Sequence, residues 1–205
     1  MNKHSFLDIL KQKVIVFDGA MGVNIQAQNL TPDDFGGEKY EGCNEYLVLK
    51  KPSAIERIHN DFLEVGCDVI ETDSFGSTPI VLAEYGLSDQ AYTLNVEAAK
   101  LAKRIASDYS INSQPRFVAG SMGPTTKLPS LGHINFKDME ATYYIQAKGL
   151  VEGGVDRGHC RLRADPFACV AGDAFAGLSN FGVWRFVGLG FVQLLRLECG
   201  CVHRR

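Results

Sequence analysis

The chain has 205 residues, of which 45% are hydrophobic and 22% charged, the proportions of a globular protein and not of a disordered or fibrous one. The formal net charge of -3 provides no concentrated basic patch, so we expect neither nucleic acid nor a membrane surface as a partner. No secretory signal is evident at the amino terminus, and the longest apolar run of the final segment, Phe186 to Leu195, is about half of a bilayer span. We therefore expect a cytoplasmic protein whose six cysteines are reduced.

The composition changes after Asp156. Residues 1–156 hold 11 Lys, 3 Arg and 21 acidic residues, whereas residues 157–205 hold no Lys, 7 Arg and 3 acidic residues. The second segment also lacks Ile, Thr and Tyr. The interior of one domain seldom changes so sharply. We therefore predict a partial domain over 1–156 and a divergent tail over 157–205 without a native fold, and a frameshift after Asp156 is one hypothesis for its origin.

Strand and helix patterns alternate through the first segment. The apolar run Val14 to Phe17 predicts a buried parallel strand. Further strands are predicted at 67–75 and 116–121, and another begins at 155–156. Helices are predicted at 53–65, with a capping box at Ser53 and an end at Gly66, then at 94–105 and from an Asp138 cap to Gly153. This order predicts an α/β fold with a parallel sheet, and it leaves a doubly wound sheet and a barrel both open.

Polar residues follow the carboxyl end of each predicted strand. Asp18 and Gly19 follow the first, Thr72 to Ser77 the second, and Ser121 to Thr126 the third. In a barrel these ends share the face where the chemistry lies. The segment Gly19 to Gly22 lacks the G-x-G-x-x-G spacing of a dinucleotide site, so a dinucleotide is not expected.

Each of these polar groups has two interpretations. Asp18 could accept hydrogen bonds from a substrate ammonium, or it could cap the backbone of the following loop. Gly19 could relieve backbone strain or let a ligand carboxylate approach main-chain N–H groups. Alternation along the strand sends Glu71 and Asp73 to one side and Thr72 and Ser74 to the other. In a barrel the inward pair could reach the pocket, or these side chains could form hydrogen bonds with neighbouring loops. The run 120–126 could cradle an anion or form a plain turn, and His59 and His133 are assigned to packing or surface.

Cysteine and histidine meet at the end of the chain. Cys199, Cys201 and His203 are the right residue types for zinc, but spacing of two on an extended segment sends the two thiols to opposite faces. Incidental thiols are the favoured interpretation of this cluster.

Several motifs, in order along the chain, carry a family resemblance. Together they resemble the amino-terminal homocysteine-binding domain of cobalamin-dependent methionine synthases, over residues 6 to 156. The motifs are VIVFDGAMG at 14–22, GCNEYL at 42–47, GCDVIETDSFGST at 66–78, AGSMGPT at 119–125 and GLVEGGVD at 149–156.

The resemblance implies a (β/α)8 barrel, here truncated to its first three to four βα units. It implies that homocysteine binds through zinc and is methylated from methylcobalamin held on another domain. Zinc would lower the thiol pKa so that the nucleophilic thiolate exists at neutral pH. The implied substrate-binding residues are Asp18, Gly19, Ala20, Thr72, Ser74 and Ser121.

The sequence departs from the family after Asp156. The family supplies one zinc cysteine and later an adjacent Cys-Cys pair, and this chain contains no Cys-Cys pair. We therefore expect it to bind neither zinc nor methylcobalamin, and to be inactive alone. Two alternatives stay open: a non-catalytic half-barrel completed by a second polypeptide that supplies the missing strands and cysteines, or an enzyme using Cys199, Cys201 and His203 as a metal site.

Overall fold

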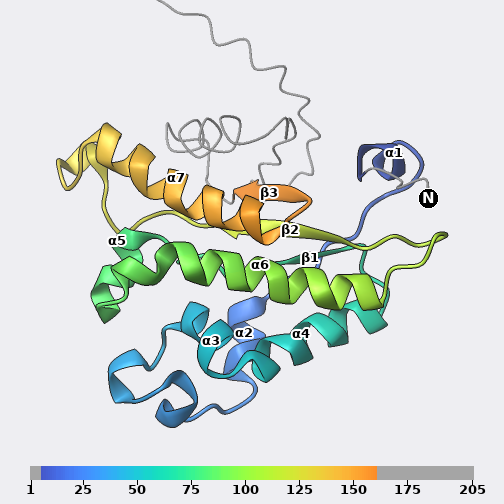
Figure 1. Cartoon of the computed structure of the whole chain (residues 1–205), viewed down its shortest axis with the longest axis horizontal. Coiled ribbons are helices and arrows are strands. Elements are labelled where there is room, and N and C mark those ends of the chain that lie inside the picture. Colours follow the sequence, from blue (N-terminus) through green and yellow to red (C-terminus); the bar gives the residue numbers. More distant parts are fainter. Residues whose placement is uncertain (1–5, 161–205) are drawn as a thin grey trace, which may run out of the picture.

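A parallel sheet forms the centre of the chain (Figure 1). The computed structural model describes residues 6–160, so the predicted metal cluster at 199–203 lies outside the described residues. The sheet has the order β1-β2-β3, from Val69–Glu71, Phe117–Met122 and Arg157–Cys160. Phe17 adds a parallel bridge to Val69 on the outer side of β1. The α/β class with a parallel sheet is therefore confirmed.

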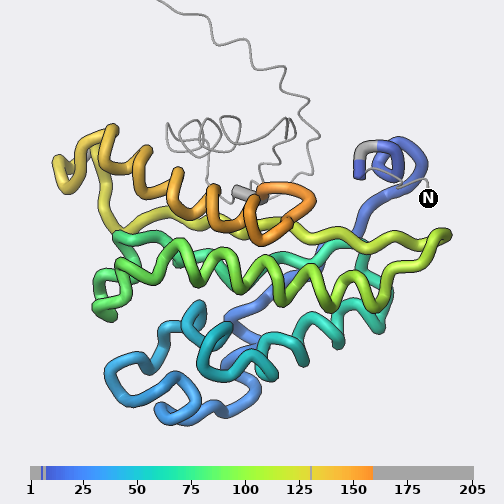
Figure 2. The backbone as a smooth tube through the Cα atoms, in the orientation of Figure 1, coloured from blue at the N-terminus to red at the C-terminus, as the bar shows by residue number. Residues whose placement is uncertain are grey.

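Helices connect the strands and form the loops around them. The α-helices are α1 (Phe6–Leu10), α2 (Met21–Gln26), α3 (Leu47–Lys50), α4 (Pro52–Glu64), α5 (Pro79–Leu82), α6 (Ala91–Asp108) and α7 (Phe136–Gly153). The 3-10 helices are η1 (Pro32–Phe35), η2 (Glu38–Tyr40), η3 (Asn44–Tyr46), η4 (Ala83–Tyr85), η5 (Ser88–Gln90) and η6 (Pro129–Leu131). The backbone trace in Figure 2 follows the chain through α2, the 3-10 turns and α3 before it enters α4.

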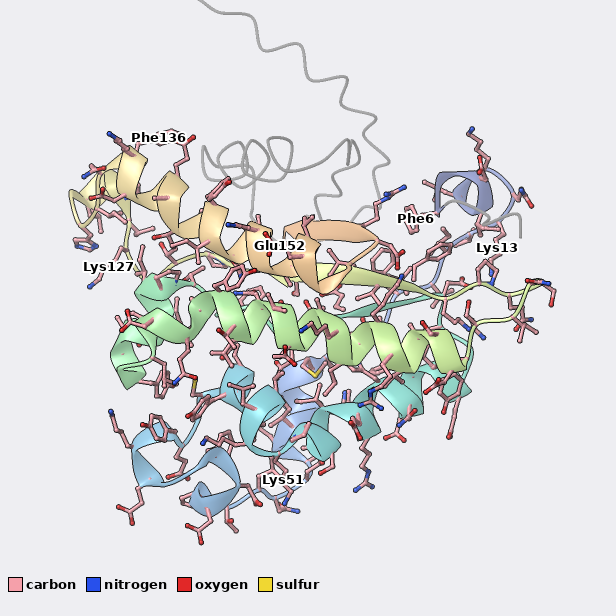
Figure 3. The ribbon with its side chains drawn as sticks, in the orientation of Figure 1. Phe6, Lys13, Lys51, Lys127, Phe136 and Glu152 are labelled. Carbon is pink, nitrogen blue, oxygen red and sulfur yellow. The ribbon has the colours of Figure 1, made fainter. Side chains whose placement is uncertain are left out.

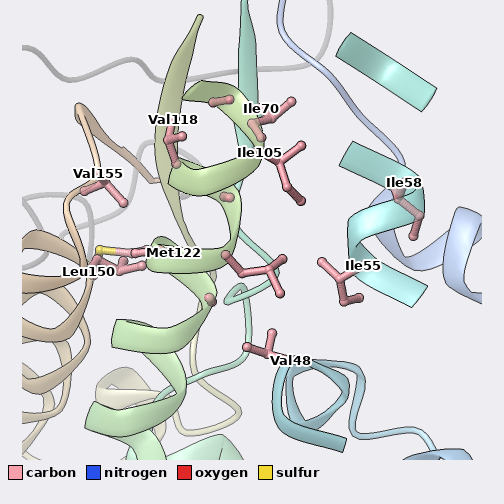
Figure 4. Packing of buried hydrophobic residues seen from close by; sticks show 14 of the residues in the cluster. Val48, Ile55, Ile58, Ile70, Ile105, Val118, Met122, Leu150 and Val155 are labelled. Atoms are coloured by element: carbon pink, nitrogen blue, oxygen red, sulfur yellow. The ribbon is translucent and has the colours of Figure 1, made fainter. Parts of the chain in front are cut away.

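The helices α4, α6 and α7 cover one face of the sheet. Ile70 and Val118 point to this side, and Figure 4 shows the buried side chains of α4 and α6 packed together there. Close contact between α6 and α7 depends on two glycines of α7. A Cβ on Gly153 would lie 2.5 Å from Ala99 Cβ, and one on Gly149 would lie 2.8 Å from the Tyr92 carbonyl oxygen. Only glycine lets the two helix backbones approach so closely.

The opposite face of the sheet carries the alternate residues of the strands. At the amino ends of the strands, Phe6 of α1 packs edge-to-face on Phe117, with ring centroids 5.3 Å apart. Figure 3 labels Phe6 at the start of α1. Val69, Ala119 and Ile15 join this second apolar cluster. At the carboxyl ends the same face carries Glu71 and Ser121. The apolar and polar ends of this face are therefore separate.

Two aspartates fix the starts of strands in the same way. Asp68 Oδ2 accepts a hydrogen bond from Val16 N–H at 3.1 Å, and Asp156 Oδ2 accepts one from Val118 N–H at 2.9 Å. Each carboxylate is also paired with a lysine, Lys13 or Lys103, at 2.5 Å. The composition boundary after Asp156 falls directly before β3, so Arg157–Cys160, the first residues beyond it, belong to the sheet.

The structure corrects three local predictions. Val14 and Val16 are 85% and 54% exposed, so the predicted buried first strand is wrong for these side chains, which lie at the outer edge of the described sheet. The helix expected from Ser53 starts at Pro52 and has no side-chain cap, because proline itself suits the first helical position. The cap of α7 is Asn135, whose Oδ1 accepts the Asp138 N–H at 2.9 Å, and not Asp138.

Candidate functional site

A cavity of about 180 Å³ opens at the carboxyl ends of the strands. Four of the predicted site residues line it, namely Asp18, Gly19, Thr72 and Ser121. Glu71 and Asp73 line it as well. The predicted alternation is wrong for Thr72, which lines the same cavity, because β1 ends at Glu71 and strand alternation does not continue beyond it. Met21 and Phe75 complete the lining. Segments more than 100 residues apart in sequence thus meet at one site, as expected for the carboxyl ends of parallel strands.

Asp18 is fixed to β1 through its side chain. Its two carboxylate oxygens both lie 3.0 Å from the Glu71 backbone nitrogen and accept its N–H. The Asp18 backbone N–H also donates to the Val69 carbonyl at 2.9 Å. This placement differs from the local loop cap considered from the sequence, because the acceptor reaches across to the neighbouring strand. The carboxylate is therefore held in a defined position at the cavity.

The turn after Asp18 leaves open space beside the carboxylate. A Cβ built on Gly19 would meet nothing within 4 Å. Ala20 adopts φ +53° and ψ +38°, a left-handed conformation that directs the chain into α2. Ala20 is not among the residues that line the cavity, so the structure gives this predicted site residue a part in the turn. The N–H groups of the first turn of α2 have no partner within the helix.

Ser74 and Thr72 join the two central loops. Thr72 Oγ1 lies 2.6 Å from Ser74 Oγ and accepts the Ser121 N–H at 2.9 Å, and Ser74 Oγ donates to the Ser121 carbonyl at 2.8 Å. Gln146 of α7 donates to the Ser74 carbonyl at 2.6 Å. Ser74 is fully buried and is not in the cavity lining. Its hydrogen bonds hold Thr72 and Ser121, which do line the cavity.

The buried Asp73 and the half-buried Glu45 form an acidic pair beside the cavity. Glu45 Oε1 accepts the Gly76 N–H at 2.7 Å and so holds the loop after β1. Burial, and then the nearby Glu45 carboxyl, raise the pKa of Asp73 well above its ordinary value. Burial also raises the pKa of Glu45. Sequence reasoning gave Glu45 no role, although it lies in the GCNEYL motif, because nothing local to that motif shows that it meets residues 73–76.

The run 120–126 forms a packing turn at Gly123. A Cβ on Gly123 would lie 2.5 Å from Phe75 Cε1, so only glycine fits against this ring. The Gly123 N–H donates to the Phe75 carbonyl at 2.9 Å, and the Gly123 carbonyl accepts the Tyr143 hydroxyl at 3.1 Å. Gly123 thereby positions Phe75 in the wall of the cavity.

The metal-binding residue types do not converge in the described part of the chain. Over residues 6–160, no group of three or more His, Cys, Asp and Glu side chains is arranged to hold a metal ion. Cys43 and Cys67 are buried in different apolar clusters, and burial is the main cause that raises the pKa of each thiol to about 12. Thiolates, which zinc requires, are disfavoured at both positions. The described residues therefore do not fit a zinc site.

The family model for homocysteine S-methyltransferase matches residues 15–160. The chain belongs to this family. It is 42% identical over 150 residues to a methionine synthase of Mycobacterium tuberculosis and 40% identical over 159 residues to one of Mycobacterium leprae. These alignments cover 73% and 76% of the chain but only 12% and 13% of the relatives. The chain thus spans about an eighth of their length, and the resemblance drawn from its motifs is confirmed.

Solved structures support the fold. The metallated form of the homocysteine methyltransferase MmuM from Escherichia coli superposes with a TM-score of 0.68 at 21% identity, over 83% of this chain and 62% of that one. The oxidised form of the same protein superposes with a TM-score of 0.69 at 20% identity, over 87% of this chain and 63% of that one. The partial parallel sheet therefore matches part of a homocysteine methyltransferase fold. Within residues 6–160, no helix is long and apolar enough to span a bilayer.

Proposed function

We propose that residues 6–160 form one wall of a (β/α)8 barrel, its first three to four βα units, and bind the amino-acid end of homocysteine. The parallel order β1-β2-β3, with helices on one face and a polar cavity at the carboxyl ends of the strands, supports this assignment. In this proposal the barrel portion defined by composition, residues 1–156, continues into β3, and the remaining residues are a separate tail.

One observation carries the proposal. Asp18 stands at the cavity in a position fixed by Glu71, with open space at Gly19 beside it. The carboxylate would accept hydrogen bonds from the substrate ammonium, and the open backbone at Gly19 would admit the substrate carboxylate to main-chain N–H groups. Thr72 and Ser121 would contact the bound amino acid from the strand ends.

The methyl transfer of the family needs more than this binding step. A metal that activates the homocysteine thiol supplies a thiolate nucleophile at neutral pH. Because the described thiols are buried and apart, we assign no zinc ligand and derive no thiol activation from them. We propose that the chain alone binds homocysteine weakly, takes up neither zinc nor methylcobalamin, and transfers no methyl group.

Calorimetric titration of the full chain with L-homocysteine and L-methionine tests the binding step. We expect both to bind, because both carry the same amino-acid end. Asp18→Asn keeps an oxygen for the Glu71 N–H but loses the charge, so affinity should fall about tenfold. Asp108→Asn on α6 is the matched control and should leave affinity unchanged. Equal affinity of the Asp18 and Asp108 variants would contradict the assignment.

Assembly with a second polypeptide is the second candidate, and the exposed edge of the sheet favours it. The segment before Asp18 bridges only to β1 among the described residues, and Val14 and Val16 there are exposed. An unpaired apolar edge is a template for another strand. Mixing the chain with a polypeptide that carries the rest of a family barrel should give a stable complex with methyl-transfer activity. Failure to associate in size-exclusion chromatography would contradict assembly without affecting the binding proposal.

A further inference from the structure

Asp73 differs from the other acidic side chains at the cavity in having no hydrogen bond from the described residues. It is only 5% exposed, and its Oδ2 is fully buried without a hydrogen-bond partner. Asp18, by contrast, accepts the Glu71 N–H, and Glu71 Oε2 accepts the Ser121 hydroxyl at 3.2 Å. A buried polar atom without a partner is costly, and a rotation of the Asp73 carboxyl that turns this oxygen toward a ligand donor in the cavity would remove that cost.

The surroundings of Asp73 are acidic. Asp18 and Glu71 line the same cavity, and Glu45 interacts electrostatically with Asp73 from the other side. The buried Cys43 thiol also lies within electrostatic range of both Glu45 and Asp73. Among the described residues that line this cavity there is no Lys, Arg or His. An ionised Asp73 would therefore lack a cationic neighbour there until a cation enters the cavity.

We propose that Asp73 is a second anionic contact for the ammonium group of the bound amino acid, present as a neutral carboxylic acid in the empty cavity and ionised by the ligand. This inference rests on the proposed function, since the ligand is the zwitterionic amino acid. The O–H bond of the acid breaks, its proton leaves to solvent, and the carboxylate oxygen accepts an N–H from the ammonium. The ammonium keeps its three protons, so one proton is released for each ligand bound.

Proton release gives the binding reaction a characteristic pH dependence. While Asp73 is protonated in the empty protein, the affinity should rise by up to about tenfold for each pH unit. L-Methionine is the suitable probe, because its thioether carries no proton and any release comes from the protein or the buffer. Asp73→Asn keeps the shape of the side chain but has no proton to lose, so its affinity should not vary in this way.

The test is calorimetry of the full chain with L-methionine over about pH 5.5 to 7, a range in which the ligand keeps its ammonium group. Each titration is run in two buffers of different ionisation enthalpy. For the wild type we expect about one proton released per ligand and an affinity that rises with pH. Asp73→Asn should still bind, more weakly, with no proton release. Glu45→Gln keeps an acceptor for Gly76 and removes the repulsion, so it should release less than one proton.

The possible outcomes distinguish the role of Asp73 from the proposed binding of the amino acid. Binding by the wild type without proton release, or the same release in Asp73→Asn, would overturn the role of Asp73 and leave the binding proposal intact. Absence of methionine binding by the folded wild type would overturn both. The carboxylic-acid carbonyl stretch in the infrared gives a check without ligand, since the empty wild type should show a band that Asp73→Asn lacks, and its absence would also overturn the inference.

Discussion

The Asp18 carboxylate holds the backbone N–H of Glu71 with both oxygens, each 3.0 Å from the nitrogen. This contact ties the chain before α2 to the end of β1. We predict that Asp18→Ala lowers the free energy of unfolding by about 1–3 kcal/mol, because a charge-assisted hydrogen bond is lost. Asp18→Asn, which retains an acceptor, should lose less. Urea denaturation measures both, and an Asp18→Ala variant as stable as the wild type would show that the contact does not stabilise the fold.

Gly153 sets the distance between α6 and α7. Its replacement by alanine would place a Cβ 2.6 Å from the Val96 carbonyl oxygen, which is backbone and cannot rotate away. We predict that Gly153→Ala destabilises the protein by about 1–3 kcal/mol through overpacking. Glu140→Ala on the exposed side of α7 is the control and should change stability by less than about 0.5 kcal/mol. If Gly153→Ala left the free energy of unfolding unchanged, α6 and α7 would be able to move apart without loss of stability.

Asp68 is a buried carboxylate with two cationic neighbours. Lys13 Nζ lies 2.5 Å from Asp68 Oδ1 and an Arg116 Nη1 lies 3.6 Å from it. Asp68→Ala should destabilise the protein by roughly 3–5 kcal/mol, because Arg116 is left buried without its partner charge. Glu97→Ala breaks an exposed pair with Lys100 and should cost at most about 1 kcal/mol. Similar thermal midpoints for the two variants would contradict this reasoning.

His59 makes stability depend on pH. It is fully buried on α4, neither ring nitrogen has a hydrogen-bond partner within residues 6–160, and burial lowers its pKa from 6.5 to about 4. Because the unfolded chain takes up this proton first, stability is complete above about pH 6.5 and falls as the pH drops toward 4. Between pH 7 and 5 the wild type should lose about 2 kcal/mol more than His59→Leu. Urea unfolding at the two pH values measures this difference, and equal losses would exclude His59 as the cause.

The sequence predicted the order of the elements well, since long periodic segments such as 94–105 and 116–121 carry their own signal. It predicted helix starts less well. Ser53 and Asp138 both match cap patterns, but α4 begins at Pro52 and α7 is capped by Asn135. A cap depends on one residue's backbone conformation, which competing neighbours decide.

The sequence predicted only those site residues that directly follow a strand. Asp18 and Ser121 could be placed together, because each follows a strand of a parallel sheet. Glu45 could not, because its contact with the loop at Gly76 arises from the folding of the long segment before α3. The exposure of Val14 and Val16 was also hidden from the sequence, since an apolar run does not show which neighbouring strands are present.

The central claim is that the cavity beside Asp18 binds the amino-acid end of homocysteine. Titration of the ¹⁵N-labelled chain with L-homocysteine, followed by amide chemical shifts, tests it most directly. We predict saturable shifts concentrated at Gly19, Thr72 and Ser121, with a half-saturating concentration about tenfold higher in Asp18→Asn. Shifts that are absent, or that cluster away from these three residues, would contradict the account.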